Sequence, residues 1–557
     1  MRKIINEPET FVDEVLDGIY HAHAGSLRPA SADGRALVRA DAPHSGRVGI
    51  VTGGGSGHLP LFLGYVGRGL CTAAAVGNVF SSPSVQQILD ASRAVEGGAG
   101  VLFLYGNYGG DVYNFGLAGD VLRAEGVPVR TVLGTDDILS APVEREHERR
   151  GVAGLVLAYK IAGAAAERGD SLEEVARLAQ DAASRTRTMG VGLGPTILPA
   201  AGEPTFELDE GEMEIGVGIH GERGVYRGAL ETADEITERF LGELQKELAL
   251  DAGSRVAVLV NGLGATPPEE LYLIYRKLEQ ELSGRGVTIV RRYVGEYATS
   301  LEMVGASVSI MELDELLEAL IEEPAESPFF HQGSAGASDV RYPEAGAARD
   351  FAQEPVSSSG TSDLRPLLDA VLPRMQQYTE ELRSLDAAVG DGDLGITVSQ
   401  GAAAVLAALD QMPHNVSDRA LLVRAGQEFA EANPSTFAAL TAAGVLAAAE
   451  TLPDDDARID GRQALRAFTE RIAARGGAQP GDKTVLDVLL PLLEESADAQ
   501  AGQLAETAAR LLEETDTWQN RRGRAAWQGE RTKGQRDPGS AAAVHFLNEL
   551  ARARGIQ

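Results

Sequence analysis

The chain has 557 residues, of which 44% are hydrophobic, and a mean hydropathy of -0.11. This length exceeds what one hydrophobic core organises, so the sequence predicts several domains. The formal net charge of -32 argues against non-specific binding to nucleic acid or to an anionic membrane, because both are polyanions. The single cysteine, Cys71, excludes an internal disulfide and a cysteine-based zinc site. The N-terminus lacks the apolar run of a signal peptide and no stretch approaches transmembrane length, so we expect a cytoplasmic protein.

Strands and helices alternate in the first part of the chain. Residues 47–52 have the pattern of a buried strand that runs into a glycine-rich loop, Gly53–Gly57, followed by His58. Such loops admit a polar group of a ligand close to the backbone, although this one matches neither a dinucleotide-binding fingerprint nor a P-loop. We expect an α/β unit with a largely parallel sheet, whose ligands lie beyond the carboxyl ends of the strands, where Asp111 also falls. The other predicted elements are a helix over 6–24, strands at 101–105 and 128–133, and one or two helices over 151–187.

A second α/β unit begins near Gly190. Residues 213–222 are predicted as a strand that contains His220 among glycines near its end. A histidine in this position is mostly structural, but its coincidence with His58 and Asp111 favours a functional interpretation. Further strands are predicted at 255–261, 287–293 and 304–311, with helices over 232–248 and 267–282.

The remainder of the chain has a different character. Residues 331–362 lose all periodicity and fill with Ser, Ala, Gly and Pro, which is typical of a linker. From 363 to 557 the strand patterns vanish, and helical periodicity predicts an all-α bundle or barrel. Its predicted helices are 364–385, 396–408, 418–430, 435–450, 462–475, 482–495, 503–515 and 540–552.

The most distinctive stretch of the helical part runs from Ser384 to Gly395. It brings Asp386, Asp391 and Asp393 together with three glycines in a predicted loop between two helices. Carboxylates this close repel one another unless a hard cation neutralises them, and the spacing is not that of an EF-hand. On spacing alone, a solvated turn remains an equal alternative to a metal site.

Three other segments of the helical part suggest a metal–nucleotide site. The segment 433–437 opens a small-residue helix whose free N–H groups could hold a phosphate. Residues 480–487 place two acids and a lysine at another helix start, and residues 521–540 form a polar loop with most of the local positive charge. The candidate nucleotide-binding residues are Asn433, Ser435, Thr436, Asp482, Lys483, Arg524, Asp537 and Gly539.

Five ordered motifs together resemble the ATP-dependent dihydroxyacetone kinase family. They are Gly53–His58, Gly106–Val112, Glu214–Glu222, Gly390–Asp393 and Pro480–Thr484. The resemblance covers nearly the whole chain and implies two domains. Residues 1–330 are similar to the ketose-binding K domain, with α/β subdomains of about 1–189 and 190–330, and residues 363–557 are similar to the helical L domain that binds ATP and Mg²⁺.

The resemblance also implies roles for single residues. His220 would attack the substrate carbonyl to form a covalent hemiaminal, Asp111 would be the general base, and His58 would hydrogen-bond and polarise the substrate. The ketose pocket would include Gly54, Gly55, Ser56 and Gly57 beside these three residues. In the L domain, Asp386, Asp391 and Asp393 match the carboxylates that hold two Mg²⁺ ions on the ATP phosphates.

Departures from the family pattern bear on the choice of substrate. Leu59 stands where the family usually has Glu, and Gly106 and Gly109 replace a Lys and a Thr ahead of Asp111. Since the three catalytic residues are kept, these changes favour an altered substrate over lost chemistry. The hypothesis is a kinase of a four-carbon ketose such as erythrulose, with dihydroxyacetone as a side substrate.

Three alternatives remain open. A phosphotransferase-system member of the family takes its phosphate from a protein, and a non-catalytic member binds sugar as a regulator. A third interpretation drops the family and keeps only a two-domain metal-binding protein. For partners, the resemblance implies a homodimer through the K domain, in which L domains can be exchanged between chains.

Overall fold

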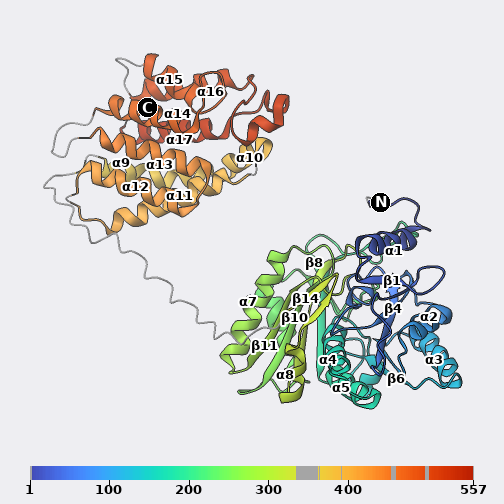
Figure 1. The fold of residues 1–557 in the computed structure, drawn as a ribbon. Coiled ribbons are helices and arrows are strands. Elements are labelled where there is room, and N and C mark those ends of the chain that lie inside the picture. Colours follow the sequence, from blue (N-terminus) through green and yellow to red (C-terminus); the bar gives the residue numbers. More distant parts are fainter. Residues whose placement is uncertain are drawn as a thin grey trace. The chain divides into compact units, whose positions relative to one another are not determined.

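The computed structural model describes residues 3–333, 362, 364–390, 392–414, 416–452, 460–495 and 501–555. The chain divides into two compact units, residues 1–340 and 341–557, and each is described here by itself (Figure 1). Most of the predicted linker, 331–362, lies outside the described residues. No helix of the described part is long and apolar enough to cross a membrane.

The first sheet has six strands in the order β1-β2-β4-β3-β5-β6. The four strands β4, β3, β5 and β6 are parallel, whereas β1 and β2 pair antiparallel at one edge. The prediction of a largely parallel sheet is therefore right for its central part. The strands are β1 Leu27–Pro29, β2 Ala36–Arg39, β3 Gly49–Ser56, β4 Ala73–Val79, β5 Val101–Gly106 and β6 Val129–Gly134.

The second sheet also has six strands, in the order β11-β10-β12-β7-β8-β9. Only β10 and β11 are parallel, and all the other neighbours are antiparallel. The strands are β7 Thr186–Gly194, β8 Glu212–Ile215, β9 Tyr226–Ala229, β10 Arg255–Gly262, β11 Thr288–Gly295 and β12 Val304–Glu312, and a small hairpin, β13 Ala325–Ser327 and β14 Phe330–Gln332, follows them.

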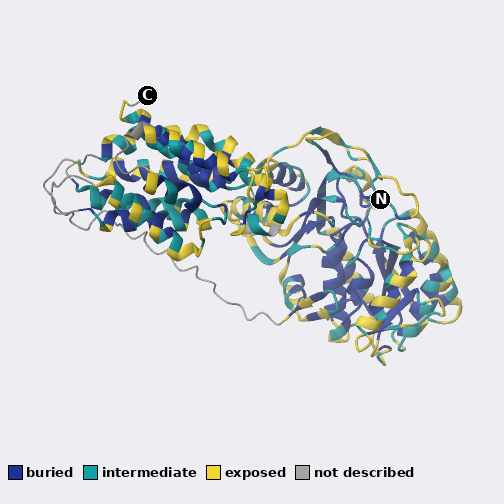
Figure 2. Cartoon of the chain, turned by 90° about the horizontal axis from the view of Figure 1, so that it is seen from above, coloured by how far each residue is buried: buried dark blue, intermediate teal, exposed yellow. Residues whose placement is uncertain are grey.

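Alternating side chains tie each sheet to a helical layer on both faces. In β5, Phe103 packs with α2 (Val85–Val95) and α3 (Gly109–Ala124), whereas Leu102 points to the opposite face and packs with α4 (Leu155–Arg168) and α5 (Leu172–Ser184). In β10, Leu259 packs with that same α4 layer, and Val258 packs with α6 (Ala233–Leu244) and α7 (Pro268–Gly284) on the far side. The α4 layer therefore lies between the two sheets. The central strands β3, β5, β10 and β12 are mostly buried, whereas the edge strands β9 and β11 are largely exposed or half-buried, and buried residues are dark blue in Figure 2.

The helices predicted in the first unit occur in the structure, whereas α2 and α8 were not predicted. The helix predicted at 6–24 is α1 Phe11–Ala22, and the one or two helices predicted over 151–187 are two. The remaining helices are α2 Val85–Val95, α3 Gly109–Ala124, α4 Leu155–Arg168, α5 Leu172–Ser184, α6 Ala233–Leu244, α7 Pro268–Gly284 and α8 Glu315–Glu322, with short 3-10 helices η1 Leu63–Tyr65 and η2 Val143–Glu148.

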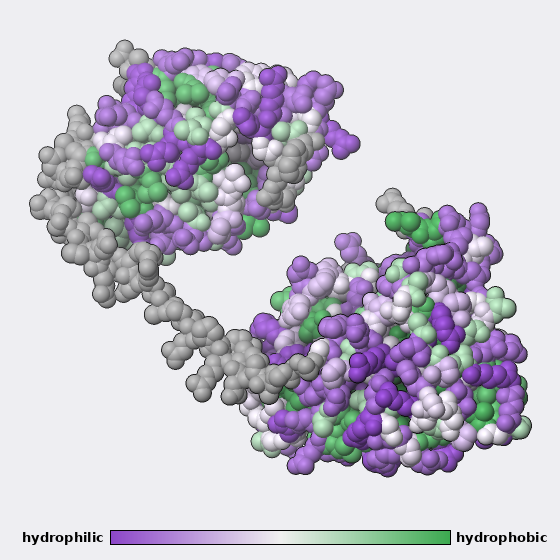
Figure 3. Space-filling view, viewed as in Figure 1, coloured by the Kyte–Doolittle hydropathy of each residue, from purple (hydrophilic) through white to green (hydrophobic). Residues whose placement is uncertain are grey.

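The described part of the second unit is entirely helical, which confirms the predicted change of fold class. Its apolar side chains form one core, and hydrophilic residues dominate the face of both units seen in Figure 3. The helices are α9 Arg365–Met375, η4 Gln376–Tyr378, α10 Thr379–Val389, α11 Leu394–Gln411, α12 Asp418–Ala432, α13 Thr436–Glu450, α14 Gly461–Gly476, α15 Leu486–Glu495, α16 Ala501–Thr515, η5 Arg524–Thr532 and α17 Pro538–Ala553.

Three predicted boundaries are wrong in ways that concern the candidate site. Strand β3 does not end at residue 52 but continues through the glycines to Ser56. Strand β8 ends at Ile215, so His220 lies in a loop and not on a strand. Asp386 lies in the last turn of α10, and so outside the predicted acidic loop.

Candidate active site

The glycines at the end of β3 leave room for backbone to approach closely. A Cβ on Gly53 would lie 2.5 Å from the carbonyl oxygen of Ala75 on the neighbouring strand. A Cβ on Gly55 would lie 2.7 Å from Cα of Phe80 and from N of Ser81. Both distances are far below van der Waals contact, so only glycine fits here. The segment is therefore a close-packed strand end against which the Phe80 turn lies.

His58 follows this strand and is 1% exposed. Its Nδ1 lies 2.8 Å from the carbonyl oxygen of Thr299, which only accepts hydrogen bonds, so Nδ1 carries the proton. Burial, reinforced by the charge of His220, lowers the pKa of His58 to about 3, so the ring is neutral. Its Nε2 is buried and has no hydrogen-bond partner among the described residues. A ligand hydroxyl could donate to this nitrogen.

His220 lies on the loop between β8 and β9, and its ring is 4.8 Å from that of His58, centroid to centroid. Nδ1 of His220 lies 3.1 Å from Oε1 of Glu222, and the His220 backbone N–H donates to Oε2 of the same carboxylate. Burial acts to raise the pKa of Glu222, but the hydrogen bond with His220 and the charges of His220 and Arg150 outweigh it and lower the pKa to about 2. The carboxylate is therefore ionised and accepts from Nδ1–H, which leaves the lone pair on Nε2.

Two aromatic residues complete the surroundings of His220. Phe80 stacks on His58 at 4.7 Å and meets His220 edge to face at 5.2 Å. Tyr108 lies 4.7 Å from His220, also edge to face, and its hydroxyl is buried with no partner in the described part of the chain. Neither ring was predicted as a site residue. Phe80 has a φ of 56°, and nothing in the sequence near it indicates this turn.

Asp111 lies in the first turn of α3, close enough to His220 for their charges to interact. It is 6% exposed, and its Oδ1 has no partner among the described residues. Burial raises the pKa of Asp111 to about 6, and the side chain of Ser82 opposes this shift. A carboxyl with a pKa near neutrality is suited to accept a proton from a bound hydroxyl. The structure thus brings the three predicted catalytic residues together.

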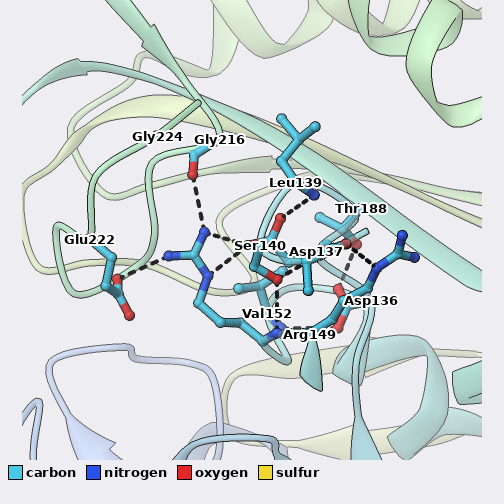
Figure 4. A network of polar contacts seen from close by, with 12 residues as sticks. Asp136, Asp137, Leu139, Ser140, Arg149, Val152, Thr188, Gly216, Glu222 and Gly224 are labelled. Atoms are coloured by element: carbon cyan, nitrogen blue, oxygen red, sulfur yellow. Dashed lines mark hydrogen bonds and ion pairs between the residues drawn. The ribbon is translucent and has the colours of Figure 1, made fainter. Parts of the chain in front are cut away.

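An arginine outside the predicted set braces the His220 loop. Arg150 donates from Nη2 to the carbonyl oxygen of Gly216, and its Nη1 lies 3.7 Å from Oε2 of Glu222. It is itself anchored by Asp137 at 2.7 Å. Figure 4 shows Glu222, Gly216 and Asp137 around this network. The sequence gives no sign of Arg150, because it is separated from the loop by more than sixty positions.

In the second unit, two of the three predicted metal ligands are described. Asp386 Oδ2 accepts from the backbone N–H of Asp393 at 2.9 Å, so the helix end and the next helix start are joined. Asp393 is the N-cap of α11, but its side chain makes no capping hydrogen bond. Asp391 lies outside the described residues, among which no cluster of three potential metal ligands occurs.

Two helix N-termini predicted to bind nucleotide lie side by side. Ser435 is the N-cap of α13 and accepts from the N–H of Ala438. Thr436 is the first residue of that helix, and Asn433 donates to Gln400 at 3.4 Å. At the start of α17, a Cβ on Gly539 would lie 3.8 Å from the ring of Phe437. The two helix starts therefore meet.

Comparison with known proteins now decides the family. The Dak1 domain matches residues 17–329, and the DAK2 domain matches residues 388–552. The chain belongs to the dihydroxyacetone kinase family. It is 39% identical to the L-erythrulose 1-kinase of Mycolicibacterium smegmatis and 36% identical to the L-erythrulose kinase of Pectobacterium atrosepticum, over 99% of this chain and 99% and 96% of those proteins. Over 99% of both chains it resembles the dihydroxyacetone kinase from C. freundii, solved in complex with AMP-PNP and Mg²⁺, with a TM-score of 0.64 and 29% identity.

As a fused member of the dihydroxyacetone kinase family, the chain is an ATP-dependent kinase of the erythrulose and dihydroxyacetone type. This rules out the interpretation in which the family is dropped. Both family domains occur in one chain, in the order that the motifs predict.

Lys483 of this kinase is not the free phosphate ligand that the sequence suggests. Its side chain is 0% exposed, and Nζ lies within 3.1 Å of four backbone carbonyl oxygens. An ammonium group has three N–H donors, so all of them are engaged. The four carbonyls belong to Asp516, Trp518, Thr532 and Gln535. Lys483 therefore closes the 516–535 loop, and the prediction that it contacts nucleotide is corrected to this structural role.

The acids near Lys483 also hold loops in place. Asp537 is the N-cap of α17 and accepts from N and Oγ of Ser540 and from Asn520. Asp482 Oδ2 accepts from the backbone N–H of Gln479 and lies 3.4 Å from Nε of Arg522. The backbone of Arg524 begins η5, and its side chain lies outside the described atoms.

The three positions noted above as departures from the family pattern have different surroundings in the structure. Leu59 packs against the apolar cluster under α1. A Cβ on Gly106 would lie 3.0 Å from the carbonyl oxygen of Gly151, so this position is tight. A Cβ on Gly109, two residues before Asp111, would meet nothing within 4 Å. Space therefore exists at Gly109 where the family usually has a threonine.

Proposed function

We propose that this kinase phosphorylates a terminal hydroxyl of a short-chain ketose, erythrulose in preference to dihydroxyacetone, while the ketose is held as a hemiaminal on His220. The observation that carries the proposal is the contact between Nδ1 of His220 and the carboxylate of Glu222, which assigns the proton to Nδ1. The Nδ1–H of His220 donates to ionised Glu222, so Nε2 has the lone pair, and buried His58 and Asp111 lie beside it.

The covalent step requires a carbonyl group. Nε2 of His220 forms a bond to the carbonyl carbon, the π electron pair moves to the carbonyl oxygen, and that oxygen takes up a proton. A polyol such as glycerol has no carbonyl group and cannot form this adduct. His58 accepts a hydrogen bond from a substrate hydroxyl at Nε2. Asp111 accepts the proton of the hydroxyl that attacks the γ-phosphoryl group.

ATP and two Mg²⁺ ions are proposed to bind the helical unit. The residues fit these groups, because Asp393 has a carboxylate free of capping bonds and Asp386 lies directly beside it. Asp386, Asp391 and Asp393 would hold the metal, whose charge offsets that of the phosphates and of the transferred phosphoryl group. The starts of α13 and α17, with Asn433, Ser435, Thr436 and Gly539, would hold the nucleotide through backbone N–H groups.

The preference for erythrulose rests on two observations. The two relatives compared above are named for erythrulose. Gly109 lies on the same helix turn as Asp111, and a Cβ there would meet nothing within 4 Å, so no side chain at this position narrows the approach to Asp111.

The test is a substrate panel with the whole chain, ATP and Mg²⁺. We expect kcat/KM for D- or L-erythrulose to exceed that for dihydroxyacetone and glyceraldehyde. A clearly higher value for dihydroxyacetone would contradict the preference.

The same panel separates the two remaining alternatives. If ATP is consumed without a phosphate-donor protein, the phosphotransferase-system alternative is excluded, as the fusion of both domains in one chain favours. If no short sugar causes ATP consumption, the protein is a sugar-binding regulator, which the intact Asp111 and acidic helix end argue against.

A further inference from the structure

The Glu222 carboxylate binds both the backbone and the side chain of His220, the proposed nucleophile. Its Oε2 accepts from the backbone N–H of His220 at 2.9 Å, and its Oε1 accepts from Nδ1 at 3.1 Å. The Glu222 side chain is 36% exposed, so it is not a packing residue of the core. By contrast, Glu214 of the adjacent strand is 3% exposed and bonds the N–H of Gly224. The Glu214 carboxylate thus holds the backbone of the loop, whereas the Glu222 carboxylate binds His220.

The absence of a side chain at Gly218 leaves room for Arg150 to contact Glu222. A Cβ on Gly218 would overlap both the carboxylate of Glu222 and Nη1 of Arg150, so the ion pair passes through the space that this glycine leaves. Arg150 in turn fixes the carbonyl oxygen of Gly216, where φ is 80°. The guanidinium is therefore placed to hold Glu222 against His220.

We propose that Glu222, held by Arg150, is a positioning residue that fixes the Nδ1–H tautomer of His220 and stabilises the charged hemiaminal. This inference rests on the proposed function. When Nε2 bonds to the carbonyl carbon while Nδ1 keeps its proton, the ring gains one positive charge. The ionised carboxylate 3.1 Å away lowers the free energy of that cation, as an aspartate does for the imidazolium of a serine protease.

The other groups around His220 cannot supply this charge. His58 is neutral, and Tyr108 carries a hydroxyl whose pKa burial raises well above its ordinary value. Asp111 is the second carboxyl that interacts with His220. Its pKa of about 6 leaves it partly protonated near that pH, so it is a weaker partner for a positively charged His220 adduct. Arg150 is positive. Glu222 is therefore the acid that stays ionised across the neutral range.

The experiment uses ketose labelled with ¹³C at the carbonyl carbon, added to the whole enzyme without ATP. In the wild type, the labelled carbon should move from the ketone to the tetrahedral region of the NMR spectrum. In Glu222→Gln, which keeps the shape but removes the charge, the adduct should weaken about tenfold or more, with a correspondingly raised KM for the ketose and a much smaller change in kcat.

Controls separate this role from a structural one. Glu210→Gln, at an exposed position outside the loop, should match the wild type. Arg150→Lys, which keeps a positive charge, should retain more adduct than Arg150→Gln. An adduct and a KM in Glu222→Gln equal to those of the wild type overturn the inference and leave the proposed function standing. If the wild type forms no tetrahedral carbon, the hemiaminal itself is wrong, and both proposals fall together.

Discussion

His58 and His220 have the same side chain and lie 4.8 Å apart, yet their surroundings give them different chemistry. Burial and a carbonyl partner keep His58 neutral and turn its Nε2 into an acceptor. An ionised carboxylate orients His220 and leaves the lone pair on its Nε2, the nitrogen proposed as the nucleophile. Burial lowers the pKa of His58 to about 3 and raises the pKa of Asp111 to about 6, a divergence that is common among neighbouring groups of active sites.

The role of Asp111 predicts a large effect on turnover. In Asp111→Asn the amide cannot accept the hydroxyl proton, so kcat should fall by about 10²- to 10⁴-fold. The ¹³C adduct on His220 should persist, because the amide keeps the size of the side chain. Steady-state kinetics and NMR check both parts, with the exposed Asp120→Asn on the same helix as control. A variant with nearly normal kcat would remove Asp111 from the mechanism.

The hydrogen bond between Ser82 and Asp111 predicts how a substitution of Ser82 changes the pH dependence of kcat/KM. The base works when ionised, so kcat/KM should fall below the Asp111 pKa of about 6. Because Ser82 lowers this pKa, Ser82→Ala should raise it and move the acid limb to higher pH. The profile of kcat/KM against pH measures the shift. Ser81→Ala, at the exposed neighbouring position, should leave the limb in place, and an unshifted limb in Ser82→Ala would contradict the assignment.

At the scale of elements, strand β3 and the Phe80 turn fit together only through a glycine. In Gly55→Ala the methyl group meets backbone atoms that cannot rotate away, so the turn must move. We expect a loss of about 1–3 kcal/mol in the free energy of unfolding and a raised KM for the ketose. Denaturant titration and kinetics give both values. Gly18→Ala in α1 meets nothing within 4 Å and should be neutral or slightly stabilising.

The loop closed by Lys483 predicts a change in stability and not in nucleotide affinity. Lys483→Met would leave buried carbonyl oxygens without donors, at a cost of about 3 kcal/mol or more to the helical unit. Chemical denaturation measures this loss. Lys533→Met, in the same loop but exposed and paired only with Glu530, should have little effect. If Lys483→Met kept its stability and raised only KM for ATP, the lysine would be a phosphate ligand after all.

At the scale of the whole molecule, the proposed catalytic residues and the proposed metal ligands belong to different units. His220 and Asp111 belong to residues 1–340, and the acidic residues belong to residues 341–557. A homodimer with composite sites formed between chains predicts that two inactive variants can complement each other. His220→Ala mixed with Asp391→Ala, under conditions of subunit exchange, should recover part of the activity. No recovery, with exchange proven by mixed labels, would place each site within one chain.

Much of the fold could be predicted because the spacing of apolar residues along the chain indicates which faces of helices and strands are buried. Residues 255–261 and 304–311 were predicted as strands and occur as β10 and β12, since a strand between two helical layers must be apolar on both faces. Strand β4 was not predicted, because its small residues, mostly alanine and glycine, carry little strand propensity. The loop around Asp386 was misjudged because helix α10 runs on to Val389.

The sequence by itself predicted the change from an α/β to an all-helical part and the candidate residue types: a histidine among glycines, an aspartate after a strand, and an acidic loop between two helices. Only the tertiary structure decided which nitrogen of His220 bears the proton, which lysine is buried, and which ring stacks on His58. Those features depend on Glu222, on Phe80 and on four carbonyl oxygens around Lys483. Contacts between distant segments leave no trace in local spacing, because a chain's periodicity records which face is buried but not what it meets there.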